Sequence, residues 1–179
     1  VAITFGLIVM AMIYAIGEQS GAHINPAVTL AFWASGTFHK KEVIPYIIAQ
    51  IIGALLASAT LYFLFPAHPT QGVTIPLNSN AQAFVLEVIL SFILMFVIIK
   101  VSTGSKESGT IAGIAIGGVV GLEAMFAGPI TGASMNPARS IAPAVFSGDL
   151  QYIWLYIVAP IIGMLLASIF CKLTTEKSS

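Results

Sequence analysis

The fold is decided by the stretch Gly21-Ala22-His23-Ile24-Asn25-Pro26-Ala27-Val28-Thr29, because a related stretch returns near the end of the chain. The second copy reads Gly132-Ala133-Ser134-Met135-Asn136-Pro137-Ala138-Arg139-Ser140. Asparagine is a favourable N-cap residue, and proline suits the first helical position because its missing N–H would have no partner there. Each copy therefore predicts a short helix that begins at its proline, inside sequence that is otherwise apolar.

Composition places these two stretches in a membrane protein. Of the 179 residues, 58% are hydrophobic and 8% are charged, whereas a soluble domain carries about 25% charged residues. Several apolar runs reach the ~20 residues that a helix needs to cross a bilayer. The net charge is zero, so we expect no nucleic-acid partner, and the single cysteine excludes a disulfide framework. We expect no metal or other cofactor, and no nucleophile–base pair indicates an enzyme.

The apolar runs and the breakers between them predict an all-α membrane protein that forms a single channel domain over residues 1–179. Two half-helices are expected at Pro26–Ser35 and from Pro137 to Phe146. Five spanning helices are expected at residues 1–17, 43–65, 81–101, 109–126 and 152–171.

The lysines predict how the chain is oriented, since Lys and Arg in short loops stay on the cytoplasmic side. The opposite loops, residues 67–80 and 147–151, contain no lysine or arginine. We therefore expect a cytoplasmic C-terminus, in a protein of the plasma membrane. The lysines that fall on one side by helix counting are Lys40, Lys41, Lys100, Lys106, Lys172 and Lys177.

The spacing of the two copies predicts an inverted repeat. Asn25 and Asn136 lie 111 residues apart with three predicted spanning helices between them, so the copies enter from opposite faces. Glu87 lies within a predicted span, 49 residues before Asn136, and its counterpart in the first copy would lie about 24 positions before Val1. We therefore expect a parent with six spanning helices, in which residues 1–66 are the remainder of the first repeat and residues 81–172 the second.

The two copies together predict a pore that excludes protons. A half-helix N-terminus carries roughly +0.5 elementary charge, and two such ends near the bilayer midplane repel cations, including hydronium. The amides of Asn25 and Asn136 would donate to a passing water, which then could not accept a proton from its neighbour. A single copy would indicate only a capped helix start. Unpaired carbonyls are tolerated at membrane depth beside a cavity, so an acceptor ladder is expected from Gly21, Ala22, His23 and Ile24, and from Gly132, Ala133, Ser134 and Met135.

These motifs resemble the major intrinsic protein family, the aquaporins and aquaglyceroporins, over the whole chain except for a first helix. The run from Phe126 to Met135 is most similar to plant nodulin-like intrinsic proteins and their bacterial relatives. The resemblance implies an aquaporin-like right-handed helical bundle and a homotetramer in the lipid bilayer. It also implies that Glu87 accepts hydrogen bonds from the pore loops and orients them, with contact to a solute as the alternative. The residues that carry it are Ser20 to His23 with Asn25 to Thr29, Thr131 and Gly132 with Asn136 to Ser140, and Glu87.

The resemblance also implies a selectivity ring at the outer side of the pore, made here by Phe5, Ala124, Ala133 and Arg139. Two alanines replace the side chains that usually narrow this ring, so the implied opening exceeds one water molecule. We expect passage of water and of small uncharged solutes such as glycerol, urea or metalloid hydroxy acids. The alternative is a strictly water-selective aquaporin.

Some residues and some functions remain open at this point. Glu123 either adds an acceptor at the outer pore or bonds the adjacent outer loop, and His23 is either a pore-lining or a packed loop histidine. An active transporter or ion channel is disfavoured, because the sequence offers no carboxylate pair or second buried basic residue for coupling. A non-conducting membrane component is the other rival.

Overall fold

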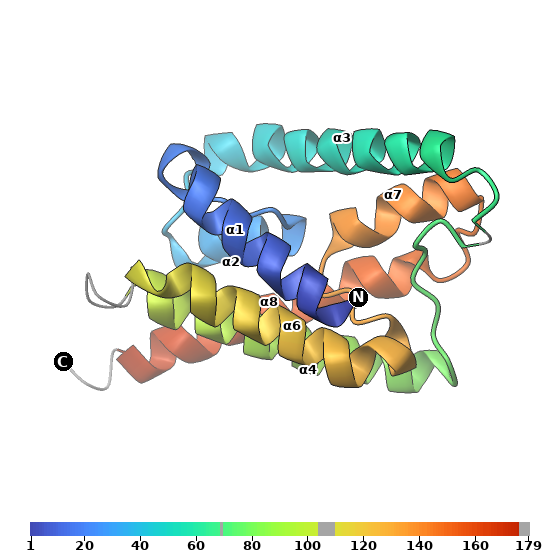
Figure 1. The fold of residues 1–179 in the computed structure, drawn as a ribbon. Helices are drawn as coiled ribbons and strands as arrows, with labels where there is room; N and C mark the ends of the chain where they lie inside the picture. Colours follow the sequence, from blue (N-terminus) through green and yellow to red (C-terminus); the bar gives the residue numbers. More distant parts are fainter. Residues whose placement is uncertain (69, 104–109, 176–179) are drawn as a thin grey trace.

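The computed structural model describes residues 1–68, 70–103 and 110–175, and within these ranges the chain is helical. Five helices are long and apolar enough to cross a membrane. They are α1 (Ala2–Ser20), α3 (Lys40–Leu64), α4 (Asn80–Ser102), α6 (Ala112–Thr131) and α8 (Ile153–Thr175). The shorter helices are α2 (Pro26–Ser35) and α7 (Pro137–Ser147). The predicted all-α architecture is confirmed (Figure 1).

The helices that precede the two signature stretches, α1 and α6, both run longer than the sequence predicts. The sequence predicts that α6 ends near Phe126, but the helix continues through Pro129, which removes one helical hydrogen bond without ending the helix. Each helix ends instead at a signature glycine, Gly21 or Gly132, whose φ of 78° or 86° is the left-handed conformation of a C-terminal cap. The predicted start of α6, at Gly109, lies outside the described residues.

The two half-helices begin in the middle of the bundle and run toward opposite ends (Figure 1). At the start of α2, the Asn25 side chain accepts a hydrogen bond from the Ala27 N–H at 3.0 Å. At the start of α7, the Asn136 side chain accepts one from the Ala138 N–H at the same distance. The opposed directions confirm the predicted inverted repeat with two re-entrant helices.

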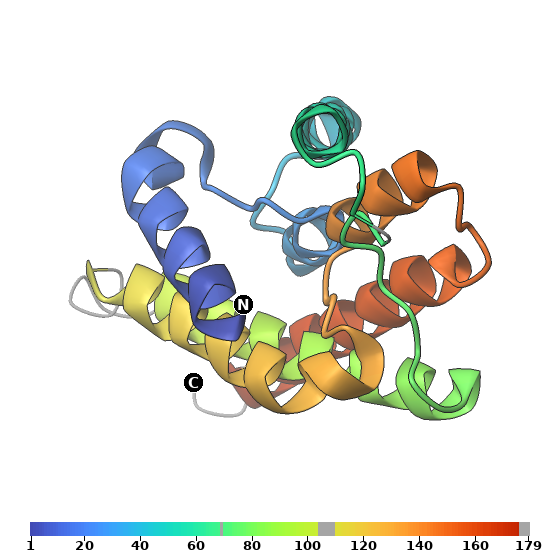
Figure 2. The ribbon, with the colours of Figure 1, turned by 45° about the vertical axis from the view of Figure 1, so that its right-hand side comes forward.

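The long helices are packed unequally. The helix α4 packs along α8, and α1 packs along α6, while α3 contacts mainly the half-helices. In Figure 2 α3 lies on the opposite side of the bundle from α4, with α2 between them. In the most apolar part of each helix, 6% of the residues of α1 and α3 are buried, against 39% to 44% in α4, α6 and α8. The second repeat therefore forms most of the core.

A second internal repeat, beyond the signatures, relates α3 to α8. Residues 46–58 read YIIAQIIGALLAS and residues 156–168 read YIVAPIIGMLLAS, identical at ten of thirteen positions. Each segment lies in the long helix that follows its half-helix. The repeat therefore extends from each signature into the next long helix. Each residue of 46–58 in α3 has an equivalent among residues 156–168 of α8.

The described lysines lie at one end of the bundle. They are found at the start of α3 and in the last turns of α4 and α8, which Figure 1 places on the same side. The one described arginine, Arg139, lies in the first turn of α7. This arrangement matches the predicted charge asymmetry for Lys40, Lys41, Lys100 and Lys172, while Lys106 and Lys177 lie outside the described residues.

Candidate pore between the two half-helices

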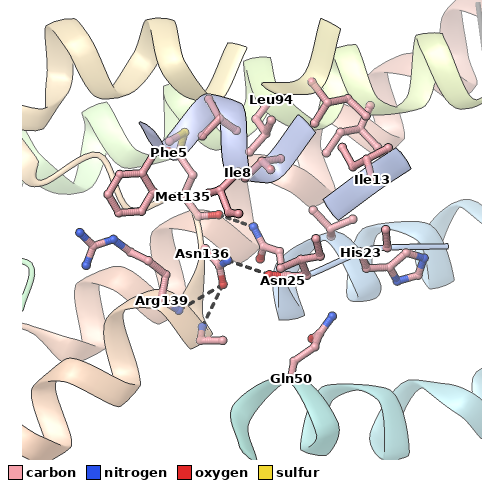
Figure 3. Close-up of a pocket in the computed structure, with 18 of the residues that line it drawn as sticks. Phe5, Ile8, Ile13, His23, Asn25, Gln50, Leu94, Met135, Asn136 and Arg139 are labelled. Atoms are coloured by element: carbon pink, nitrogen blue, oxygen red, sulfur yellow. Dashed lines mark hydrogen bonds between the residues drawn. The ribbon is translucent and has the colours of Figure 1, made fainter. Parts of the chain in front are cut away.

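The side chains of Asn25 and Asn136 cross between the two signature loops. Asn25 Nδ2 donates to the Met135 carbonyl at 2.7 Å, and Asn136 Nδ2 donates to the Ile24 carbonyl at 2.9 Å. Each Oδ1 accepts the N–H groups of its own half-helix. A side-chain amide carries two N–H hydrogens, so each asparagine keeps one for a molecule in the cavity that both line (Figure 3).

The first loop (residues 21–25) and the second loop (residues 132–136) follow the same backbone path. Both contain non-glycine residues at positive φ, a conformation that costs energy and is uncommon outside functional segments. The φ angles are 78°, 45° and 52° at Gly21, Ala22 and Ile24, and 86°, 42° and 52° at Gly132, Ala133 and Met135.

Most of the predicted pore residues line one cavity that runs along both loops. Its lining includes Gly21, Ala22, His23, Ile24 and Asn25 from the first loop, Ala133, Ser134, Met135 and Asn136 from the second, and Ala138 from α7. Figure 3 shows Phe5 and Arg139 at one end, His23 at the other, and the two asparagines between them.

The remaining signature residues lie behind this lining. Pro26, Ala27 and Pro137 are buried within the starts of the half-helices. Gly132 lies against Thr74, whose Cγ2 would be 3.0 Å from a Cβ atom placed on the glycine. Gly132 is not among the residues that line the cavity. Its predicted role, a backbone carbonyl that accepts hydrogen bonds in the pore, stays a prediction.

The four predicted ring residues line the same cavity. The Arg139 guanidinium lies over the Phe5 ring, with Cζ 5.3 Å from the ring centroid. Arg139 Nη1 also donates to the Gly72 carbonyl at 2.8 Å. Ala124 and Ala133 contribute only methyl groups, so the polar part of the ring is the guanidinium. The structure brings these residues together, and their role in selectivity stays a prediction.

Glu87 is fully buried in α4 and supports the second loop. It accepts hydrogen bonds from Thr131 Oγ1 at 2.7 Å, from the Ser134 N–H at 2.9 Å and from the Met135 N–H at 2.8 Å. Three donors satisfy most of the hydrogen-bonding capacity of a carboxylate that would otherwise be costly to bury. This geometry is the one expected for the predicted support of the loop.

In the first loop, a hydroxyl near the start of α2 holds the side chain of His23. His23 Nδ1 lies 3.1 Å from Thr29 Oγ1, which also accepts a hydrogen bond from Gln50 Nε2 at 3.1 Å. Because His23 also lines the cavity, the two predicted readings apply together: the histidine is packed and it faces the cavity. The aromatic rings around its imidazole, with centroids 4.7 to 4.9 Å away, belong to Phe32, Phe38 and Tyr46.

Beside the second loop, in the first turn of α7, the equivalent hydroxyl belongs to Ser140, which follows Asn136 as Thr29 follows Asn25. Ser140 Oγ lies 2.5 Å from Ser134 Oγ and accepts a hydrogen bond from Thr74 Oγ1 at 2.8 Å. Thr74 belongs to the segment between α3 and α4. This segment is therefore joined through Thr74 to Ser140, which contacts Ser134 of the second loop, and through its Gly72 carbonyl to Arg139.

Comparison with known proteins assigns the chain to a family. The model of the family described as Major intrinsic protein matches residues 1–171. The chain belongs to the major intrinsic protein family. The predicted resemblance is therefore confirmed, and the chain is an integral membrane protein.

Relatives with similar sequences include plant proteins named as NIP-type aquaporins or as a nodulin. Aquaporin NIP1-1 of Zea mays is 49% identical over 91% of this chain and 58% of its own length. Nodulin-26 of Glycine max is 46% identical over 91% of this chain and 60% of its own length. The chain spans 54% to 62% of the length of the curated relatives that it matches.

A solved structure shares the fold. The aquaglyceroporin from Plasmodium falciparum has a TM-score of 0.84 and 26% sequence identity, over 94% of this chain and 79% of that chain. The likeness confirms the predicted aquaporin-like arrangement of spans and half-helices.

Glu123 follows neither of its two predicted readings in this member of the family. Its side chain is 1% exposed within α6 and does not line the cavity. Neither carboxylate oxygen has a hydrogen-bond partner among the described residues. Among the described residues it therefore makes no bond to the segment between α3 and α4, and it does not reach the cavity.

Several supporting residues carry no motif signal of their own. Thr74 and Gln50 reach the loops from distant segments, so only the tertiary structure pairs them with Ser140 and Thr29. Two signals were available in the sequence: the hydroxyls four residues after each asparagine, and the repeat that relates α3 to α8.

Proposed function

We propose that the whole protein is a passive transmembrane channel that conducts water and small uncharged solutes and excludes protons and other ions. The observation that carries this proposal is the crossed pair of asparagines, Asn25 and Asn136, at the facing N-termini of α2 and α7. Each helix start carries a partial positive charge and each amide keeps one free donor. A water between them donates to its neighbours and cannot relay a proton, and cations are repelled.

The proposed solutes include glycerol, urea or metalloid hydroxy acids. The ring of Phe5, Ala124, Ala133 and Arg139 supports this breadth, because two of its four members are alanines. The guanidinium offers donors to solute oxygens, and the Phe5 ring offers an apolar wall. A strictly water-selective aquaporin is the alternative, in which these methyl groups do not widen the opening enough for a polyol.

Proteoliposomes that contain the full-length protein test the proposal. We expect water, glycerol and urea permeabilities above those of empty vesicles, with no ionic current and no proton leak. Water permeability without glycerol or urea permeability would favour the water-selective alternative. A proton or cation current would contradict the channel mechanism.

The ring assignment has its own test. The double variant Ala124→His with Ala133→Cys narrows the ring, so we expect lower glycerol permeability with water permeability preserved. Ala81→Cys, at the exposed start of α4, is the control and should leave both permeabilities unchanged. Equal glycerol permeability in the double variant and in wild type would show that these residues do not form the constriction.

Three features of the assembled protein are also proposed. A helix equivalent to α4 lies against α1 and α3, whose apolar faces are largely exposed in the described chain. The lysine-bearing end and the C-terminus face the cytoplasm, in the plasma membrane. Four copies form a homotetramer. Chemical crosslinking in membranes tests the tetramer, and lysine labelling from each side tests the orientation; crosslinked dimers alone or labelling from the outside would contradict them.

A further inference from the structure

Two tyrosines at matching positions of the repeat bind the last carbonyls of the helices that enter the loops. Tyr156 of α8 donates its hydroxyl to the Thr131 carbonyl at 2.5 Å, and Tyr46 of α3 donates to the Ser20 carbonyl at 2.9 Å. Thr131 is the last residue of α6 and Ser20 is the last residue of α1. The last carbonyls of a helix have no partner within the helix, so each tyrosine supplies one.

Ser20 and Thr131, whose carbonyls the tyrosines bind, also form hydrogen bonds at the turns into the two loops. Ser20 Oγ accepts a hydrogen bond from the Ala22 N–H at 3.2 Å, and Thr131 Oγ1 accepts one from the Ala133 N–H at 3.0 Å. A shift of Thr131 is therefore transmitted to Ala133, which is a proposed ring residue. The first loop connects Ser20 to Ala22 in the same way, at the opposite end of the cavity.

The surroundings of the two tyrosines differ. Tyr156 is fully buried, in a small apolar cluster with Ala83 and Leu155. Because the Tyr156 side chain is cut off from water, no water molecule can replace its hydroxyl as the donor to the Thr131 carbonyl. Tyr46 is half-buried, its hydroxyl also accepts the His23 N–H at 3.2 Å, and its ring packs on the His23 imidazole.

We propose that Tyr46 and Tyr156 are positioning residues of the channel, whose hydroxyls fix the place of the two pore loops. Neither tyrosine lines the cavity, so both act through the backbone that they hold. Tyr156 acts on the ring through Thr131 and Ala133 and therefore governs the choice between solute and water. Tyr46 acts on the first loop, away from the ring, and therefore governs the permeability to water and the permeability to solute alike. The inference rests on the proposed channel function.

Phenylalanine removes only the hydroxyl and keeps the ring packing, so it isolates the hydrogen bond. In Tyr156→Phe the buried Thr131 carbonyl loses its partner, which is costly, and the loop moves to relieve that cost. A displaced Ala133 changes the fit of a solute that fills the ring more than the fit of a single water. In Tyr46→Phe the ring is untouched, so water and solute permeabilities fall together.

The experiment compares four variants of the full-length protein in proteoliposomes, with permeability expressed per folded channel. Tyr156→Phe is expected to change the ratio of glycerol to water permeability by about two- to tenfold, the range that one hydrogen bond covers. Tyr46→Phe is expected to lower both permeabilities without a change in their ratio. Tyr152→Phe, directly before α8, and Tyr62→Phe in α3 are the matched controls and should behave as wild type. A ratio in Tyr156→Phe equal to that of Tyr152→Phe overturns the proposal.

Amide hydrogen exchange gives a second measurement that does not depend on transport. Residues 132–135 in Tyr156→Phe, and residues 21–24 in Tyr46→Phe, should exchange faster than the same residues in the control variants. If Tyr156→Phe does not fold, unchanged exchange in Tyr46→Phe still overturns the proposal. A wild-type protein without water or solute permeability would refute the proposed function instead, and the exchange measurement would decide the role of the tyrosines separately.

Discussion

The first loop and the second loop share their backbone angles and differ in what surrounds them. The Glu87 carboxylate of α4 accepts hydrogen bonds from the second loop, and Thr74, between α3 and α4, donates to Ser140 of α7 beside that loop. Tyr46 of α3 accepts the His23 N–H of the first loop, and Gln50 of α3 donates to Thr29 of α2 beside it, with no carboxylate on the first loop among the described residues. The φ angles of the two loops nevertheless agree. The signature residues themselves therefore determine the backbone conformation, and the supporting side chains only stabilise it.

The local interactions within each signature explain this independence. A left-handed glycine ends the preceding helix, a serine or threonine hydroxyl accepts the N–H two residues later, and asparagine caps the half-helix. All three interactions join residues that are close in the sequence. The comparison therefore predicts that removing a support weakens one loop and leaves the other unchanged.

Glu87→Ala should have the largest effect. It leaves the Thr131 hydroxyl and the N–H groups of Ser134 and Met135 without their acceptor, at about 1–3 kcal/mol for each buried donor. We expect a free energy of unfolding lowered by about 3 kcal/mol or more, measured by thermal unfolding in detergent. Hydrogen exchange should rise in residues 132–136 only.

The control for this variant is Glu18→Ala, which removes an exposed carboxylate from the end of α1. It should leave the melting temperature unchanged. An equal increase of exchange in both loops of Glu87→Ala would show that the loops are not independent.

Gly163→Ala compared with Gly53→Ala tests the faces of α8 and α3, where the two glycines occupy the same position of the repeat. A Cβ atom on Gly163 would collide with the Val88 carbonyl oxygen of α4, whereas one on Gly53 meets nothing within 4 Å. Overpacking of this kind costs about 1–3 kcal/mol, so we expect Gly163→Ala to lower the melting temperature. In the full-length protein the proposed helix against α3 predicts a comparable loss for Gly53→Ala. A neutral Gly53→Ala would contradict that helix.

The sequence predicts the parts of this molecule that local interactions encode. The starts of both half-helices follow from Asn-Pro, and the spans follow from apolar length. The sequence misses the end of α6 because Pro129 is a strong signal for the end of a helix. Only the structure shows that α6 continues through Pro129 and ends at Gly132. The hydrogen bond between Thr74 and Ser140 joins residues from distant segments, so no spacing rule predicts it.

Thr74→Val compared with Gln50→Leu separates the two supporting side chains. Thr74→Val removes the hydroxyl that donates to Ser140, and should cost about 0.5–1.5 kcal/mol. Gln50→Leu also removes a donor, but its Oε1 is already buried without a partner, so the loss of that acceptor offsets part of the cost. We expect the melting temperature to fall more for Thr74→Val. The reverse order would show that the first loop depends more on its support than the second.

Glu123→Met should have the smallest effect and the opposite sign. Glu123 occupies in α6 the position that Met12 occupies in α1, 111 residues earlier. Since neither carboxylate oxygen has a partner among the described residues, methionine removes the cost of burying a polar group. We expect a free energy of unfolding that is unchanged or raised by up to about 1 kcal/mol, with glycerol and water permeabilities as in wild type.

Glu123→Gln is the matched control for that variant, because it keeps the shape of the side chain and removes the acid. It should differ from wild type by less than about 0.5 kcal/mol, as substitutions without a lost contact do. A clear loss of stability in both variants would mean that the carboxyl group is held in the membrane-embedded protein by a partner such as an ordered water. The second repeat would then have one more buried polar support than the first, and the difference between the two halves would be larger than their loops alone indicate.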